Sequence, residues 1–343
     1  MTLIHFRNDY NDIAHPDILT YLQALSDRKH IGYGLDFHSE RAKVFIQQYF
    51  KRKVYIHFMV GGTSTNKTVI AHLLKPYEAV IAAESGHIAV HETGAIEATG
   101  HKVIIVPSVN GKLTPEDIKR VYESHTDEHM VKPKLVYISN ATETGHIYTK
   151  KELRSIYKMA QSLGLYVYLD GARLGVALTS NDNDLSFDDL MSYTDIFYIG
   201  GTKNGAMLGE ALITKHQSFD ENYRYSIKQQ GGMLAKGFLI GCQFEMLFKD
   251  FLFFDIGRQA NEMSQYLCKK LKELNLTFTP TPTNQQFLTL PNDAVTALEE
   301  NYSFEVWHRY SDQTMIRLVT TYRTTTDEID QLMMDIKQLL EKK

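Results

Sequence analysis

Short runs of consecutive apolar residues alternate with amphipathic stretches over the middle of the chain. Seven runs, rich in β-branched and aromatic residues, occupy residues 54–60, 79–83, 102–107, 134–139, 165–170, 195–200 and 210–214. Such a run is typical of a strand that is buried on both faces of a parallel sheet. The alternation therefore predicts an α/β fold with a mainly parallel seven-stranded sheet flanked by helices.

The stretches between these runs have the patterns of helices. Over residues 151–163, apolar side chains recur on one face with the helical period, and Gly164 follows where helices commonly end in a left-handed residue. Thr149 and Glu152 have the spacing of a capping box. We therefore expect a helix between the fourth and fifth strands.

The pattern changes in the last third of the chain. We expect helical structure over residues 236–274, then strands at 286–290 and 315–319 and a final amphipathic helix. A chain of 343 residues is long for one hydrophobic core, so these elements predict a smaller α+β C-terminal domain. The expected parts are an N-terminal segment over 1–45 that packs on the small domain or on a neighbouring subunit, a large domain over 46–240, and a connecting helix with the small domain over 241–343.

Composition and charge narrow the class of protein. The net charge of −4 gives no indication of a nucleic-acid surface or of an acidic membrane partner. Two cysteines, Cys242 and Cys268, are too few for a disulfide framework or a cysteine-based zinc site, and we expect no metal. With no run of 18 apolar residues and no secretion signal at its start, the chain is expected to be cytoplasmic.

Candidate chemistry lies where two successive apolar runs end. The fifth run ends in Asp170, and the sixth is followed by Thr202 and Lys203. In open α/β sheets, ligands bind outside the carboxyl ends of the strands. Taken singly, Asp170 could cap a turn and Lys203 could face solvent, but together they bring a carboxylate and an amine to the same edge of the sheet.

The turn after the first run has the form of a phosphate cup. Gly62, Thr63 and Ser64 open a helix there, where backbone N–H groups and the helix dipole favour an anion. An alternative is a P-loop of a nucleoside triphosphatase, because only one glycine of that pattern is missing, at Asn66. That glycine stands where the loop must turn tightly, and the alternative gives Lys203 no role.

A histidine follows the second run. His87 could stack on a planar ring or transfer a proton near neutral pH, although a structural role is equally open for a histidine taken alone. A lysine that forms an imine, an aspartate that keeps a pyridine nitrogen protonated and a separate phosphate cup are what a pyridoxal phosphate enzyme requires. The combination predicts pyridoxal 5′-phosphate as the cofactor.

In this order, the motifs resemble the pyridoxal phosphate-dependent low-specificity threonine aldolase and β-eliminating lyase family, whose fold is the aspartate-aminotransferase type, fold type I. The likeness covers nearly the whole chain. It includes Phe6-Arg7-Asn8-Asp9, Gly62-Thr63, His87, Asp170-Gly171-Ala172-Arg173, Thr202-Lys203, Gly231-Gly232-Met233 and Ile316-Arg317-Leu318-Val319-Thr320.

The resemblance implies a role for each of these positions. Catalytic roles fall on Lys203, His87 and Asp170. Cofactor contacts fall on Gly62, Thr63, Ser64, His87, Asp170, Arg173, Thr202 and Lys203. Contacts with the substrate carboxylate fall on Asn8, Arg173 and Arg317, since a guanidinium fork suits a planar anion.

The sequence also departs from the family pattern. Thr142 stands where such aldolases typically have a second histidine near the substrate hydroxyl. Leu234 stands where an arginine often reaches the phosphate of a neighbouring subunit, and Lys228 or Lys236 could replace it. The first departure leaves open which group is the base for that hydroxyl.

The resemblance implies a carbon–carbon lyase that acts on a small amino acid. The expected reaction is retro-aldol cleavage of L-threonine, L-allo-threonine or a related β-hydroxy amino acid to glycine and an aldehyde. The motifs leave β-elimination on a serine- or cysteine-like amino acid open, because the same cofactor serves both reactions. The resemblance also implies a homodimer or homotetramer with active sites near the subunit interface.

Overall fold

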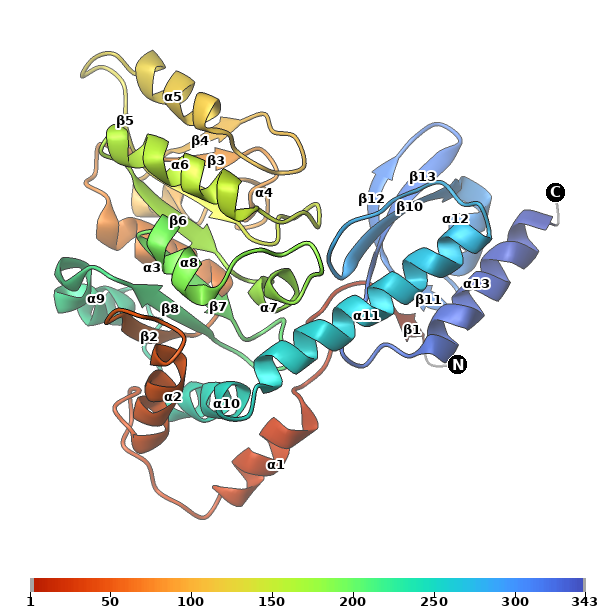
Figure 1. The fold of residues 1–343 in the computed structure, drawn as a ribbon, viewed down its shortest axis with the longest axis horizontal. Helices are drawn as coiled ribbons and strands as arrows, with labels where there is room; N and C mark the ends of the chain where they lie inside the picture. Colours follow the sequence, from red (N-terminus) through yellow and green to blue (C-terminus); the bar gives the residue numbers. More distant parts are fainter. Residues whose placement is uncertain (1–2, 342–343) are drawn as a thin grey trace.

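A computed structural model describes residues 3–341, and its largest element is a seven-stranded sheet in the order β2-β8-β7-β6-β5-β3-β4 (Figure 1). The strands are β2 (Tyr55–Met59), β3 (Glu78–Ala83), β4 (Val103–Val106), β5 (Lys132–Ser139), β6 (Tyr166–Asp170), β7 (Ile196–Gly200) and β8 (Glu210–Thr214). Each lies on one of the seven apolar runs. Only β8 is antiparallel to its neighbours in this sheet. The predicted mainly parallel seven-stranded sheet is confirmed.

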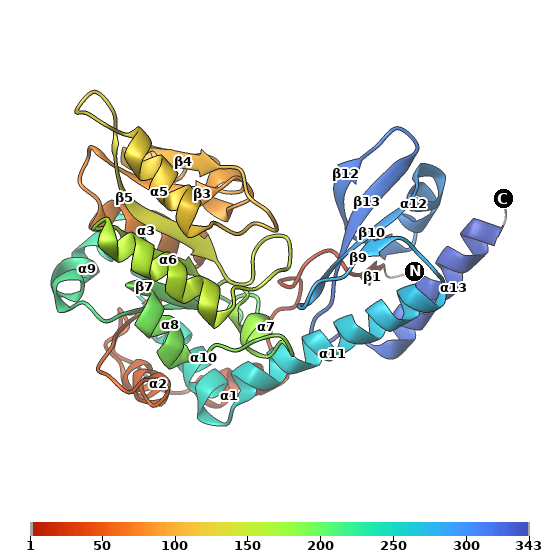
Figure 2. The ribbon, with the colours of Figure 1, turned by 45° about the horizontal axis from the view of Figure 1, so that its top comes forward.

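Helices cover both faces of this sheet (Figures 1 and 2). One face packs against α3 (Gly62–Leu73) and α9 (Gln217–Gln229), the other against α6 (Lys150–Ser162), α8 (Phe187–Tyr193) and α10 (Phe238–Lys249). Because side chains alternate along a strand, three buried tyrosines of adjacent strands share the α3 face: Tyr137, Tyr168 and Tyr198. Buried phenol hydroxyls need hydrogen-bond partners, and this requirement shapes the site described below.

The expected helix over 151–163 is α6, and both of its predicted ends are confirmed. Thr149 and Glu152 form a capping box, with each side chain bonded to the other residue's backbone. Gly164 takes a left-handed φ of 67° just beyond the helix. A second helix on the same face, α5 (Pro115–Ser124), also begins with a capping box.

The C-terminal elements form a second, smaller unit of sheet and helices with its own hydrophobic core. A four-stranded antiparallel sheet has the order β12-β13-β10-β9, packs against α12 (Asn292–Leu298) and shares a hydrophobic core with α13 (Thr326–Glu341). The strands are β9 (Phe278–Thr279), β10 (Gln285–Pro291), β12 (Glu305–Arg309) and β13 (Gln313–Val319). The helical stretch expected over 236–274 is two helices, α10 and α11 (Leu252–Glu273), because Phe251 takes a left-handed φ of 64° between them.

The described part of the N-terminal segment contacts both the smaller C-terminal unit and the helices on the large sheet. Strand β1 (Ile4–His5) pairs in parallel with β11 (Tyr302–Ser303), whereas α1 (Pro16–Ala24) and α2 (Phe37–Gln47) pack on α10. The long helix α11 runs from the helices of the large sheet to the smaller C-terminal unit in both views (Figures 1 and 2). The boundaries 1–45, 46–240 and 241–343 themselves stay a prediction. Within residues 3–341, no helix is long and apolar enough to cross a membrane.

Candidate active site

The carboxylate of Asp170 lies at the carboxyl end of β6 and is 3% exposed. Its Oδ2 accepts hydrogen bonds from the Tyr137 hydroxyl at 2.6 Å and from Asn66 Nδ2 at 3.1 Å. Its Oδ1 accepts from the Tyr198 hydroxyl and from a backbone N–H two residues further on. Burial acts to raise the pKa of Asp170, but the charge of His87 and these hydrogen bonds outweigh it and lower the pKa. A negative charge is therefore held inside the protein.

The N-terminus of α3 lies beside this carboxylate. No side chain caps the helix, and the first N–H groups of a helix have no acceptor within it. The side chains of Thr63 and Ser64 add two hydroxyls to this turn. A Cβ atom on Gly62 would lie 3.2 Å from the Tyr198 hydroxyl that donates to Asp170. Glycine therefore lets an anion-binding turn approach the Asp170 cluster closely.

A hydrogen-bonded chain connects α3 with the histidine predicted to stack on the cofactor. His87 begins α4 (His87–Val90), and its Nδ1 lies 2.8 Å from Glu92 Oε1. Asn66 Nδ2 donates to the same oxygen at 2.7 Å and also to Asp170. The Glu92 carboxylate therefore fixes the orientation of the His87 ring relative to Asp170.

A buried glutamate holds the loop that carries Lys203. Glu210, the first residue of β8, accepts a hydrogen bond from the backbone N–H of Gly201 and another from the Thr202 hydroxyl, both at 2.8 Å. Burial raises the pKa of Glu210 to about 7. The Thr202 hydroxyl, predicted to contact the cofactor, is thus used in the structure to fix the loop.

The Lys203 amine has the properties of a nucleophile. Burial and then the Arg173 guanidinium lower the pKa of Lys203, and the carboxylate of Asp9 only partly offsets them. Nζ lies 5.8 Å from the centre of the Tyr10 ring, and within residues 3–341 no side chain or carbonyl accepts a hydrogen bond from it. A lysine with a lowered pKa is more often neutral, which attack on a carbonyl requires.

Arg173 is engaged by an acid from the N-terminal segment. Its Nε and Nη2 donate to the Asp9 carboxylate at 2.8 and 3.0 Å, and both side chains are buried. Burial acts to raise the pKa of Asp9, but Arg173, Lys203 and the Asn284 hydrogen bond together outweigh it and lower the pKa. Asn8 points elsewhere: its Oδ1 accepts from the Tyr10 N–H, and it lines a hollow beside Arg323. The substrate roles of Arg173 and Asn8 stay predictions.

Arg317 has no such acidic partner. It lies on β13, where Nη1 donates to Gln285 Oε1 at 3.2 Å and the guanidinium lies over the Trp307 ring at 5.3 Å. Its Nε is buried, and within residues 3–341 neither this atom nor the rest of the guanidinium has a carboxylate partner. Burial and the like charge of Arg173 lower the pKa of Arg317. The Arg317 guanidinium can therefore bind an anion, such as a carboxylate, through its unused N–H groups.

Two residues after β5 belong to the site although sequence reasoning gave them no role. The Asn140 N–H donates to the Asp170 carbonyl at 2.9 Å, while its Nδ2 is buried without an acceptor in the described chain. Glu143 accepts from the His87 N–H. A buried donor without a partner is costly, so Asn140 fits a site in which a bound molecule supplies the acceptor. Neither residue stands in a recognisable motif, and only the fold brings them to Asp170.

The positions that depart from the family pattern are either bonded within the protein or exposed. Thr142 is fully buried, and its hydroxyl donates to the Asn110 carbonyl at 3.0 Å. Lys228 and Lys236 are exposed, and Lys228 Nζ lies 5.1 Å from the centre of the Tyr33 ring. A contact of either lysine with a neighbouring subunit's phosphate stays a prediction.

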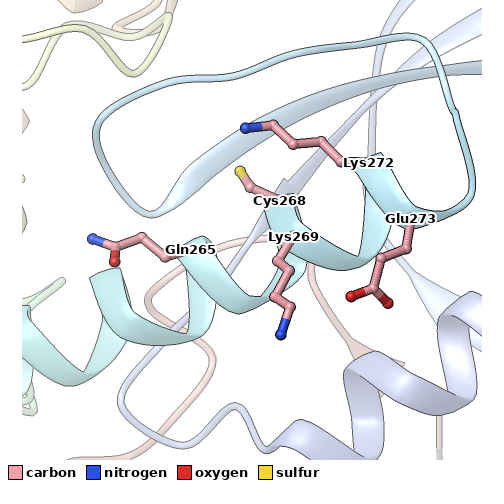
Figure 3. A pocket seen from close by; sticks show the side chains of 5 residues that line it. All are labelled: Gln265, Cys268, Lys269, Lys272 and Glu273. Atoms are coloured by element: carbon pink, nitrogen blue, oxygen red, sulfur yellow. The ribbon is translucent and has the colours of Figure 1, made fainter.

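One hollow lies away from this chemistry. It is shown in Figure 3 and is lined by residues of a single helix, α11, among them Cys268 and Lys272, far along the chain from every predicted site residue. Over residues 3–341, no three His, Cys, Asp or Glu side chains are placed to hold a metal ion.

The comparison with known proteins agrees with this geometry. A profile of the family described as beta-eliminating lyase matches residues 23–294, which is most of the chain. The chain belongs to the beta-eliminating lyase family. The lyase is 29% identical over 318 residues to a low specificity L-threonine aldolase from Pseudomonas aeruginosa, and this match covers 90% of each chain.

Solved structures give the same result. The lyase superimposes on the threonine aldolase of Leishmania major with a TM-score of 0.96 and 42% identity, over 98% of this chain and 99% of that one. Aspartate aminotransferase from Thermus thermophilus has a TM-score of 0.74 at 15% identity, over 98% of this chain and 91% of that chain, which shows the shared fold. The predicted family and fold type I are confirmed.

The P-loop alternative is not favoured. Helix α3 already begins at Gly62, so Asn66 lies inside the helix and donates to Asp170 and Glu92 instead of lining a phosphate loop. An open helix N-terminus, a buried carboxylate and a half-buried amine with a lowered pKa fit a pyridine cofactor that carries a phosphate and an aldehyde.

Proposed function

We propose that this protein is a pyridoxal 5′-phosphate-dependent aldehyde-lyase that cleaves L-threonine, L-allo-threonine or a related β-hydroxy amino acid to glycine and an aldehyde. The likeness to threonine aldolases over nearly the whole chain supports the reaction. The observation that carries the proposal is the Lys203 amine, whose pKa is lowered, on the same edge of the sheet as the buried Asp170 carboxylate.

Residues on three elements would hold the cofactor. Lys203 would bind its aldehyde carbon, Asp170 its ring nitrogen, and the open turn of Gly62, Thr63 and Ser64 its phosphate. When bound, pyridoxal phosphate supplies an electron sink that stabilises negative charge at the substrate Cα. The chain's own part is to keep Asp170 ionised, which holds the ring nitrogen protonated, and to keep the His87 ring oriented through Glu92.

The substrate carboxylate would bind to Arg317. Its guanidinium has unused N–H groups, and a bidentate pair with a carboxylate is a strong, directional contact. Arg173 already donates two hydrogen bonds to Asp9, so it offers the substrate less. Holding the carboxylate at Arg317 would decide which bond at Cα breaks.

A homodimer or homotetramer would complete the protein, with active sites near the subunit interface. The segment before α2 and the first residue of that helix expose four apolar side chains: Ile31 (67%), Tyr33 (45%), Leu35 (55%) and Phe37 (66%). Exposed apolar patches are typical of interfaces, so these neighbouring positions support this part of the proposal. Light scattering on the purified protein would measure the mass in solution; a monomer would contradict this part of the proposal. A cytoplasmic location stays a prediction.

The test is a product assay on the purified protein with pyridoxal phosphate. Incubation with L-threonine and L-allo-threonine should release glycine and acetaldehyde in equal amounts. Serine and cysteine are the comparison substrates, since β-elimination would release ammonia and a 2-oxo acid. Release of only the latter products would favour β-elimination, and no turnover of either set would refute an enzymatic function on these substrates.

A further inference from the structure

A second acid lies in the site, on the loop after β5. Glu143 is 8% exposed, and its Oε1 accepts hydrogen bonds from the Ser139 hydroxyl at 2.8 Å and from the His87 N–H at 3.1 Å. Within residues 3–341, Oε2 accepts no hydrogen bond from another residue, although the carboxyl group also bonds the backbone N–H of Glu143 itself. These bonds fix the carboxyl group beside His87, and a carboxylate oxygen still has lone pairs for a further partner.

We propose that Glu143 is the base that accepts the proton of the substrate's β-hydroxyl group, a role that rests on the proposed aldol cleavage. As the Cα–Cβ bond breaks, the O–H electron pair forms the C=O bond of the aldehyde and the proton moves to Glu143. The electron pair of the broken bond stays with Cα, which then takes up a proton to give glycine. One proton is lost and one is gained, so the step needs no further reactant.

Two other candidates for this proton, Thr142 and His87, each have a hydrogen bond of their own. The Thr142 hydroxyl, at the position where related aldolases typically have a histidine, is fully buried and donates to the Asn110 carbonyl. His87 uses Nδ1 on Glu92 and is expected to lie on the cofactor ring. A general base needs a free acceptor within hydrogen-bond reach of the proton, and Glu143 Oε2 accepts no hydrogen bond from another residue within 3–341.

The surroundings of Glu143 raise its pKa above the ordinary value of a glutamate. Burial and then the like charge of Asp170 on β6 raise the pKa, whereas a hydrogen bond from its own backbone N–H, the Ser139 hydrogen bond and the charge of His87 on α4 lower it. Arg173, before α7 (Leu174–Leu178), also lies within range of this charge. The phenols of Tyr137 and Tyr148 also lie within range of its charge. Cleavage should therefore fall as the pH drops through the raised pKa of Glu143.

The first test distinguishes proton removal from the substrate's β-hydroxyl from the reactions at Cα that do not involve this hydroxyl. Glu143→Gln keeps the size of the side chain and removes the base, so threonine cleavage should fall by about 10²- to 10⁴-fold. Glycine has no β-hydroxyl, so exchange of its α-proton with solvent deuterium, followed by NMR, should stay within a few-fold of wild type. The visible spectrum and affinity of pyridoxal phosphate should not change.

Each other outcome counts against the proposal. Full cleavage activity in Glu143→Gln would overturn it, and equal loss of cleavage and glycine exchange would show a general structural role. If the wild type exchanges glycine protons but cleaves no β-hydroxy amino acid, the proposed function itself is refuted and this inference with it.

A second variant keeps the test valid if Glu143→Gln folds poorly. Ser139→Ala removes a hydrogen bond that lowers the pKa of Glu143, so the acid limb of the cleavage rate should move to higher pH while the rate at alkaline pH recovers. Glu143→Asp should restore part of the cleavage. An acid limb that Ser139→Ala leaves in place would contradict Glu143 as the titrating group.

Discussion

Glu210 offers a quantitative test of how the Lys203 loop is held. Its carboxyl accepts the Gly201 N–H and the Thr202 hydroxyl, and burial raises its pKa from the ordinary 4.5 to about 7. An acid whose folded-state pKa is raised binds protons more tightly in the folded than in the unfolded chain. The contribution of this proton to the stability of the cofactor-free protein is therefore lost as the pH rises from 4.5 to about 7.

The size of this effect follows from linkage. At about 1.36 kcal/mol for each pKa unit, raising the pKa from 4.5 to about 7 corresponds to an upper bound of about 3 kcal/mol. Glu210→Gln keeps an acceptor for Gly201 and does not titrate. Urea unfolding at pH 4.5 to 8, followed by circular dichroism, should show the variant gaining up to this amount relative to wild type. A stability difference that is constant with pH would refute the assignment.

Two further substitutions test the arginines. Arg317→Ala should raise KM for threonine about tenfold to a hundredfold, because one hydrogen bond to a charged group is lost, and it should leave the cofactor spectrum unchanged. Arg323→Ala is the exposed control. Loss of cofactor from Arg317→Ala would contradict the role of Arg317 in binding the substrate. Asp9→Asn leaves buried Arg173 unpaired and should cost about 3–5 kcal/mol of unfolding free energy, whereas Asp12→Asn, in an exposed pair, should cost less than about 1 kcal/mol by the same urea assay.

The large sheet could be predicted from the sequence because its strands are buried on both faces. In β3, β7 and β8 every residue is buried, so the apolar run and the strand coincide. Strand β12 is partly exposed, and β1 pairs over two residues only, so neither leaves a clear pattern. Such strands depend on pairing with a distant segment, which local sequence does not record.

The centre of the site was predictable for a related reason. Asp170 and Lys203 follow successive strands, and carboxyl ends of parallel strands share one edge. The residues that tune them were not predictable: Asp9 reaches Arg173 across the fold, and Glu210 and Glu143 act through burial. The sequence does not show whether an acidic side chain is buried or exposed, so only the fold distinguishes the two.

The central claim is that Lys203 binds the cofactor. The protein reconstituted with pyridoxal phosphate should be reduced with borohydride and digested, and the pyridoxyl group located by mass spectrometry. We predict the label on Lys203, and none in Lys203→Ala. Lys215→Ala is the matched control, because the pKa of Lys215 is also lowered, mainly by burial, yet its amine is bonded to the Thr194 carbonyl and to Tyr157. This control should keep the label on Lys203. A label on any other lysine, or one retained at full level in Lys203→Ala, would contradict the account.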